Sequence, residues 1–190
     1  MTGVILAGGR SSRMGRNKAF LEAGGERLID RQVRLFRSLF REVIIVTVSP
    51  LDYLDQPAAI ATDIFPGRGA LGGIYTGLFH ASDEQAIFVA CDMPFLNPDF
   101  LAYMAAQAAG RDIVVPAPPD GLQPLHAIYS RRCLPVIRGL LEKERLKITG
   151  FYPGFDTLLI PPETLQRFDP EGRMFLNINR PADLRHLATL

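Results

Sequence analysis

The chain has 190 residues, of which 47% are hydrophobic and 22% charged, and its net charge is +1. This length allows a sizeable core, and no apolar run approaches the roughly twenty residues that a bilayer-spanning helix requires. The only two cysteines, Cys91 and Cys133, stand in unrelated contexts, which argues against a disulfide framework, and the first residues lead into an apolar strand without a signal-peptide pattern. We expect one domain over residues 1–190, located in the cytoplasm and not in a membrane.

The charge is distributed unevenly along the chain. Residues 1–41 hold nine Lys and Arg against three Asp and Glu, which makes this part +6 and leaves −5 for the remainder. A basic segment is compatible with nucleic acid, but aromatic residues are not interleaved with these cations as they are in proteins that stack bases. A small, highly charged anion is the simpler partner, so we expect no nucleic-acid binding.

Apolar periodicity divides most of the chain into alternating strands and helices. In chain order the expected strands are 4–7, 43–48, 58–62, 86–91 and 112–116, and the expected helices are 27–41, 71–82 and 98–109. The last third is less regular, with strands expected at 123–129, 157–160 and 174–179 and helices at 131–142 and 181–187. Strand–helix alternation without repeats predicts an α/β fold with a doubly wound, mostly parallel sheet.

The first expected strand continues into a glycine-rich basic segment, LAGGRSSRMGRNK, at residues 6–18. Its glycines permit a tight turn and a close approach to a ligand, and its cations and backbone donors suit a polyphosphate. The spacing does not match a Walker A loop, because Lys18 follows Gly15 by three residues, and it contains no G-x-G-x-x-G. A solvated basic loop is the simpler alternative.

This segment resembles the signature loop of nucleotidyltransferases, L-A-G-G-x-S-x-R-M-G-x-x-K, and in particular that of the molybdenum cofactor guanylyltransferases. The resemblance implies a Rossmann-like nucleotidyltransferase fold with three α/β/α layers. It also implies catalytic roles for Arg13 and Lys18, which would hold the β- and γ-phosphates. The residues of this segment that it places at the nucleotide are Leu6, Ala7, Gly8, Gly9 and Lys18.

Carboxylates follow two of the expected strands. Asp63 comes after 58–62 and Asp92 after 86–91, and ligands of open parallel sheets bind beyond the carboxyl ends of the strands. Alone, Asp92 would be a cap or turn residue, but beside a triphosphate loop it is placed to hold Mg²⁺. The sequence CDMP at 91–94 also resembles the family's C-D-x-P, which implies a catalytic, metal-binding and nucleotide-binding Asp92. We expect Cys91 to be a packing residue.

Two further motifs extend the resemblance. Asp63 with the glycines of 67–73 resembles D-x-x-x-G-x-G-P-L-x-G, which implies that Asp63 and Gly72 bind the nucleotide, although Ala70 stands where the family usually has proline. The sequence NINRP at 177–181 resembles N-x-N-x-P, from which Asn179, rather than Asn177, would complete the metal shell. For Asn179 alone, a helix N-cap before Pro181 is an equal alternative.

Less specific features complete the expected site. Residues Gln123 and Pro124 resemble a family element near the acceptor. The three histidines, His80, His126 and His186, have no partner pattern, so we expect them to be hydrogen-bonded structural residues.

The resemblance implies a Mg²⁺-dependent enzyme that transfers GMP from GTP to the phosphate of molybdenum-bound molybdopterin, with release of pyrophosphate. Its partners would be GTP, a molybdopterin-type acceptor, and other proteins that make or receive the molybdenum cofactor. Three alternatives stay open at this point. They are a sister cytidylyltransferase or sugar-phosphate nucleotidyltransferase, a non-catalytic nucleotide-binding module, and a nucleic-acid-binding protein.

Overall fold

The computed structural model describes residues 1–8 and 18–178 and is centred on one large sheet. The seven strands lie in the order β5-β4-β1-β6-β8-β7-β9. Within this sheet β8 runs antiparallel to β6 and β7, and every other pairing is parallel. The strands are β1 (Thr2–Leu6), β4 (Glu42–Thr47), β5 (Ala59–Thr62), β6 (Gln85–Ala90), β7 (Ile113–Pro116), β8 (His126–Ser130) and β9 (Thr157–Ile160).

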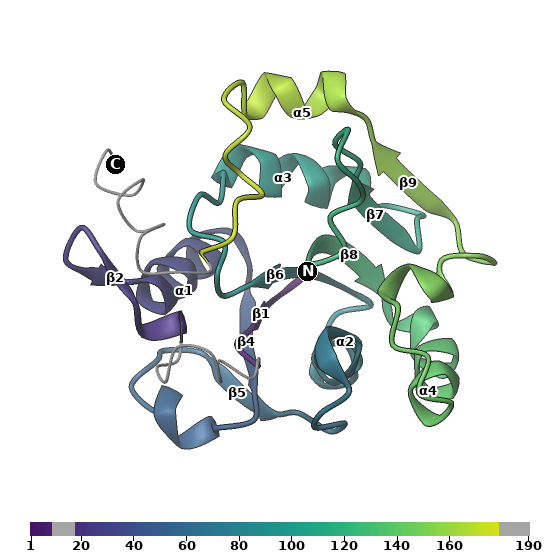
Figure 1. Ribbon diagram of the computed structural model, residues 1–190, viewed down its shortest axis with the longest axis horizontal. Coiled ribbons are helices and arrows are strands. Elements are labelled where there is room, and N and C mark those ends of the chain that lie inside the picture. The colour runs from purple at the N-terminus through teal and green to yellow at the C-terminus, as the bar shows by residue number, and fades with distance from the viewer. Residues whose placement is uncertain (9–17, 179–190) are drawn as a thin grey trace.

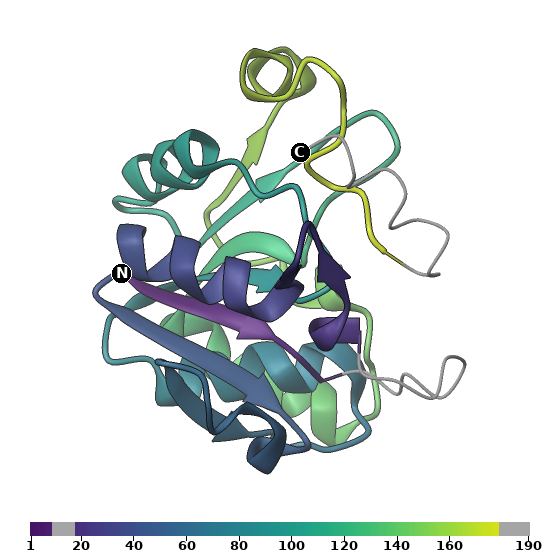
Figure 2. The ribbon, with the colours of Figure 1, turned by 90° about the vertical axis from the view of Figure 1, so that its left-hand side faces the viewer.

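Helices cover both faces of the sheet. The α-helices are α1 (Leu28–Leu39), α2 (Gly69–His80), α3 (Pro98–Gln107), α4 (Leu134–Glu142) and α5 (Pro162–Phe168). The 3₁₀ helices are η1 (Lys18–Phe20), η2 (Pro50–Tyr53), η3 (Arg131–Cys133) and η4 (Ile148–Phe151). Helices α1, α3 and α5 pack on one face, and α2 and α4 pack on the other (Figures 1 and 2). The doubly wound, mostly parallel, three-layer fold is therefore confirmed. Among the described helices none is long and apolar enough to cross a bilayer.

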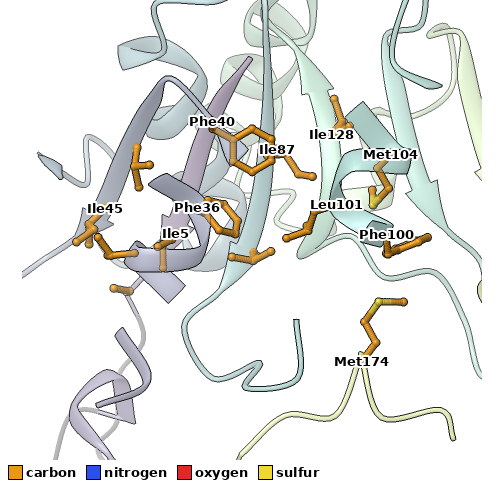
Figure 3. Packing of buried hydrophobic residues seen from close by; sticks show 14 of the residues in the cluster. Ile5, Phe36, Phe40, Ile45, Ile87, Phe100, Leu101, Met104, Ile128 and Met174 are labelled. Carbon is orange, nitrogen blue, oxygen red and sulfur yellow. The ribbon is translucent and has the colours of Figure 1, made fainter. Parts of the chain in front are cut away.

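The core consists of two apolar clusters separated by the sheet. Because side chains alternate along a strand, Ile5 and Ile87 point to the α1 and α3 layer, whereas Val4 and Phe88 point to α2. The first cluster also receives Met174, which points from the C-terminal segment toward α3 (Figure 3). Strands β1 and β6 are buried on both faces, as their uninterrupted apolar sequences predict.

Helix α2 begins earlier than the sequence pattern predicts. The expected glycine loop at 67–73 is helical from Gly69 onward, and only Gly67 and Gly69 have positive φ, at 83° and 64°. The later glycines serve helix packing. A Cβ on Gly77 would lie 2.6 Å from Phe88 Cε1 and 2.8 Å from Val4 Cγ1, so glycine lets α2 approach the sheet closely.

The expected strand at 174–179 is wrong for the described part of that segment. Residues 174–178 form a turn and an irregular stretch, in which Met174 and Ile178 are buried and Leu176 is 49% exposed. The Ile178 N–H donates to the Asp92 carbonyl at 2.8 Å, but residues 174–178 are not part of a strand. The apolar pattern therefore reflects a segment that covers the edge of the core. The expected helix at 181–187 lies outside the described residues.

The sequence pattern also missed a small hairpin. Strands β2 (Glu22–Ala23) and β3 (Glu26–Arg27) pair antiparallel around two glycines, Gly24 and Gly25, that both have positive φ. This is the backbone that a two-residue hairpin turn requires. The hairpin precedes α1 directly and follows η1, so it links Lys18 to the helix layer.

Candidate active site

A cleft of about 190 Å³ lies at the carboxyl ends of the parallel strands β1, β4 and β6. Its walls combine strand ends, the start of α2 and the loop before β8. The lining residues are Leu6, Ala7, Gly8, Lys18, Val46, Asp63, Gly69, Ala70, Gly73, Ala90, Cys91, Asp92 and Leu125. This position is the one that the parallel sheet predicts for a ligand site.

One ion pair lies in this cleft. Lys18 Nζ donates to Asp92 Oδ2 at 3.4 Å, and each side chain is 23% exposed. Lys18 comes from η1 and Asp92 from the turn after β6, so 74 residues of chain separate the two groups. The fold thus brings together two of the three residues to which the sequence assigns catalytic roles.

Backbone hydrogen bonds hold the turn that carries Asp92. The Met93 N–H donates to the Ala90 carbonyl at 3.2 Å, and the Cys91 N–H donates to the Leu6 carbonyl at 3.0 Å. Ile178 adds its contact to the Asp92 carbonyl from the C-terminal segment. The carboxylate therefore projects from a backbone that is anchored to β1, to its own strand and to the segment that contains Ile178.

Cys91 lines the same cleft but is not suited to be a nucleophile. Burial, followed by the neighbouring Asp92 carboxylate, raises the pKa of the Cys91 thiol to about 12. The thiol is protonated at neutral pH, and the thiolate is the reactive form. The expected packing role agrees with this environment.

Asp63 is oriented by hydrogen bonds from both sides of its loop. Its Oδ1 accepts from the Phe65 N–H at 3.0 Å and from the Thr76 hydroxyl at 3.0 Å. Thr76 is fully buried in α2, and its hydroxyl also accepts from the Ile64 N–H at 2.9 Å. Asp63 is thereby joined to α2, and its carboxylate lies at the cleft wall.

The start of α2 contributes backbone to the cleft. Gly69, Ala70 and Gly73 line it, whereas Gly72 does not. A Cβ on Gly72 would lie 2.9 Å from the Phe65 carbonyl oxygen, so Gly72 packs against the loop after β5. The N-terminus of a helix presents unpaired N–H groups and a partial positive charge, which favour an anion.

The floor of the cleft is formed by the end of β1. The Ala7 N–H donates to the Val46 carbonyl at 2.8 Å, and the Tyr53 hydroxyl donates to the Ala7 carbonyl at 3.5 Å. A Cβ on Gly8 would meet the backbone of Val46 and Thr47 only at 3.9 Å. Packing within the described chain does not require glycine at position 8, and a nucleotide-binding role for Gly8 stays a prediction.

The loop before β8 forms the opposite side. Leu125 lines the cleft, and the buried Tyr129 hydroxyl donates to the Pro124 carbonyl at 2.7 Å and contacts the Tyr152 hydroxyl at 2.8 Å. The segment with Gln123 and Pro124 therefore lies beside the cleft, and its role near the acceptor stays a prediction.

The carboxylates of the cleft do not form a metal site of their own. In the ranges that the structure describes, no three His, Cys, Asp or Glu side chains are grouped closely enough to hold a metal ion. A single carboxylate, Asp92, is nevertheless a fitting donor for a hard cation that shares phosphate oxygens, because Mg²⁺ is commonly held by one or two carboxylates plus substrate phosphates.

The predicted site residues divide into four groups. Leu6, Ala7, Gly8, Lys18, Asp63 and Asp92 line the cleft, and Gly72 lies behind it. Gly9, Arg13 and Asn179 lie outside the described residues, and Asn177 is exposed. The lining that the sequence missed includes Gly69, Gly73 and Leu125. Gly69 and Gly73 stand in the glycine-rich stretch already singled out, whereas nothing distinguishes Leu125 in the sequence.

The prediction of a hydrogen-bonded His126 is wrong. His126 is fully buried on β8 and packs against Phe100 and Phe175, at ring-centroid distances of 5.6 and 5.3 Å. Within the described part of the chain neither ring nitrogen has a hydrogen-bond partner. Burial lowers the pKa of His126 to about 3, so the ring is neutral at physiological pH.

Comparison with known proteins agrees with this geometry. The family model for a MobA-like NTP transferase domain matches residues 3–150. The molybdenum cofactor guanylyltransferase of Desulfosudis oleivorans is 41% identical over 97% of this chain and 92% of its own length. A probable molybdenum cofactor guanylyltransferase of Pelotomaculum thermopropionicum is 39% identical over 96% of this chain and 89% of its own.

A solved structure of a related protein is also similar to this chain. The crystal structure of molybdopterin-guanine dinucleotide biosynthesis protein A from Archaeoglobus fulgidus aligns with a TM-score of 0.85 and 27% identity, covering 100% of this chain and 97% of that one. These relatives confirm the resemblance seen in the sequence and the assignment to the nucleotidyltransferase enzymes. The chain belongs to the molybdenum cofactor guanylyltransferase family.

Proposed function

We propose that this protein, acting as one nucleotidyltransferase domain over residues 1–190, transfers GMP from GTP to the phosphate of molybdenum-bound molybdopterin. An oxygen of the acceptor phosphate attacks the α-phosphorus, and the bond between the α-phosphorus and the bridging oxygen breaks. The products are the guanine dinucleotide cofactor and pyrophosphate. The observation that carries this proposal is the Lys18–Asp92 pair in a cleft beyond the carboxyl ends of β1 and β6.

The described residues suit phosphoryl chemistry by positioning and charge. In the proposal Lys18 and Arg13 hold the β- and γ-phosphates, and backbone from 6–9 and the start of α2 surrounds the nucleotide. Asp63, oriented by Phe65 and Thr76, lines the cleft, and in the proposal it binds the nucleotide. The Cys91 thiol is protonated at neutral pH, and we propose direct transfer without a covalent enzyme intermediate.

The cation of the proposal is Mg²⁺, with Asp92 as its carboxylate ligand and Asn179 as a further oxygen donor. Bound there, Mg²⁺ would neutralise charge around the transferred phosphate. Lys18 is the counter-charge of Asp92 in this structure, at 3.4 Å. With substrate bound, Lys18 would pair with the triphosphate and Asp92 would hold the cation, so both charges would remain compensated.

The test is pyrophosphate release by the purified protein with molybdenum-bound molybdopterin and each nucleoside triphosphate in turn. We expect turnover with GTP and Mg²⁺. Asp92→Asn should lose Mg²⁺-dependent turnover while remaining folded, because the amide lacks the charge that holds the cation and contributes similar packing. Asp156→Asn, at an exposed position just before β9 and outside the cleft lining, is the matched control and should retain full activity.

Two outcomes would contradict the proposal. Faster turnover with CTP than with GTP would place the protein in a cytidylyl branch and leave the phosphate chemistry standing. Near-normal pyrophosphate release by Asp92→Asn at low Mg²⁺ would contradict the metal assignment.

A further inference from the structure

Gln32 is a polar residue on the buried face of α1. It stands three residues after Ile29 and four before Phe36, both of which are fully buried, and only 2% of Gln32 is exposed. A glutamine in this position gives up the hydration of its amide, so its hydrogen bonds have to explain its presence.

The Gln32 amide contacts the turn that carries Asp92. Its Nε2 donates to the Ala90 carbonyl at 3.1 Å and to the Met93 carbonyl at 2.9 Å. These carbonyls belong to the first and last residues of the turn, so the amide bridges its two ends. Because both partners are acceptors, only the NH₂ end of the amide can face them.

The carbonyl end of the Gln32 amide has no hydrogen-bond donor among the described residues. Gln32 Oε1 is buried and has no hydrogen-bond partner among the described residues. An unpaired buried acceptor costs free energy, so an apolar side chain of similar volume would serve packing alone at least as well. The two donated hydrogen bonds are therefore what distinguishes glutamine at this position.

We infer that Gln32 is a positioning residue that fixes the turn at 90–93 and thereby places the Asp92 carboxylate opposite Lys18. The inference rests on the proposed function, in which Asp92 holds the cation. The backbone contacts of Cys91, Asp92 and Met93 define the turn, and Gln32 ties it to the helix layer. Removing a group that orients a metal ligand typically lowers metal affinity or activity about 10- to 100-fold.

Strand β6, which leads into the Asp92 turn, offers a matched control. Gln85 stands at the start of β6, and its Nε2 donates to the Ala108 carbonyl at 2.8 Å and the Arg111 carbonyl at 2.7 Å. Gln85 thus makes the same kind of two-carbonyl bridge at the end of β6 that is remote from Asp92. Comparing Gln32→Met with Gln85→Met separates an effect on Asp92 from the loss of such a bridge in general.

Three measurements test the inference on the full chain. The first is the Mg²⁺ concentration for half-maximal turnover with GTP, which we expect to rise about 10-fold or more in Gln32→Met, with a smaller change in KM for GTP. The second is Mn²⁺ binding in the presence of GTP, followed by electron paramagnetic resonance, which should weaken in parallel. The third is amide hydrogen exchange at Cys91 and Met93, which should accelerate. Gln85→Met should change none of the three.

The outcomes separate this inference from the proposed function. If Asp92→Asn is inactive and Gln32→Met has wild-type Mg²⁺ dependence, Mn²⁺ binding and exchange, the positioning role is wrong and the proposed function stands. If Asp92→Asn keeps Mg²⁺-dependent turnover, the metal role of Asp92 is wrong. If Gln32→Met does not fold, Gln32→Asn, which keeps the amide but shortens its reach, takes its place, and unchanged exchange in it would also contradict the inference.

Discussion

At the scale of single residues, the Lys18–Asp92 contact is the most informative feature. Two opposite charges from distant parts of the chain meet at 3.4 Å in a cleft, although each side chain is only partly exposed. A partly buried pair of this kind gives up hydration on both sides, and this cost offsets much of the attraction between the charges, so the pair is weak evidence for a role in stability. We interpret the pair as a preorganised arrangement of the two charges that the proposed reaction needs.

His126 makes a residue-scale prediction about pH. Its folded pKa is about 3, below the ordinary value of 6.5, so the unfolded chain binds a proton between these values and the folded chain does not. Its contribution to stability is complete above about pH 6.5 and falls as the pH drops toward 3, by at most about 1.4 kcal/mol per pH unit.

Replacing His126 by an apolar residue should remove this part of the pH dependence. The free energy of unfolding of His126→Leu, relative to that of the wild type, should therefore be higher at pH 5 than at pH 7.5. Urea unfolding at both pH values measures this difference. An unaltered pH slope in His126→Leu would show that His126 is not the group that titrates.

At the scale of elements, α2 determines much of the site because its glycines set its distance from the sheet. Gly73 lies against Leu6, and an added Cβ would approach Leu6 Cδ2 to 3.1 Å. Farther along the helix, Gly77 lies between Phe88 and Val4. Side chains at these positions would push the helix away from β1 and β6, and the start of α2 would move with it.

Gly77→Ala should accordingly destabilise the protein. Overpacking of a filled core costs typically about 1–3 kcal/mol, and the better helix propensity of alanine offsets up to about 1 kcal/mol of this. Gly139→Ala, within α4 and with no heavy atom within 4 Å of the added Cβ, should instead stabilise by about 0.5–1 kcal/mol. Guanidinium unfolding of both variants measures the two effects. A stable Gly77→Ala would mean that α2 can shift at little cost.

At the scale of the whole molecule, the site depends on cooperative folding because its parts come from β1, η1, β4, α2, β6 and the loop after β5. A ligand that binds only this assembled cleft stabilises the native state by about 2.7 kcal/mol at one hundred times its Kd. For a chain of this length such a gain raises Tm by about 5–10 °C.

The proposed preference for guanine can be tested through this rise in Tm on ligand binding. With Mg²⁺ present, GTP should raise Tm clearly more than CTP or ATP at the same concentration, because a site that hydrogen-bonds one base leaves its own polar groups unpaired with another. Differential scanning calorimetry with each of the three nucleotides measures these shifts in Tm. Equal shifts for all three would indicate recognition of the triphosphate alone.

Much of the fold could be predicted because its signals are local. The uninterrupted apolar runs of β4 and β6 have the length and composition of buried strands. Asn97 followed by Pro98 marks the start of α3, where the Asn97 side chain accepts from the Phe100 N–H at 3.0 Å. The segment at 174–178 could not be predicted, because an apolar side chain shows that a residue is buried and does not show whether its backbone pairs with a strand.

The sequence by itself determined the α/β class, the family motifs and the strand ends where Asp63 and Asp92 stand, since each depends on neighbouring residues. Only the tertiary structure decided that Lys18 meets Asp92, that Gly72 lies behind the cleft while Gly73 faces it, and that Gln32 holds the Asp92 turn. The contacts of Lys18 and Gln32 join residues that are far apart in the chain. Gly72 and Gly73 are neighbours in the chain, but one step along a helix turns them toward different surroundings. The periodicity of a sequence indicates which face of its own helix or strand a residue occupies. Only the packing of the elements shows which residue of another element it contacts.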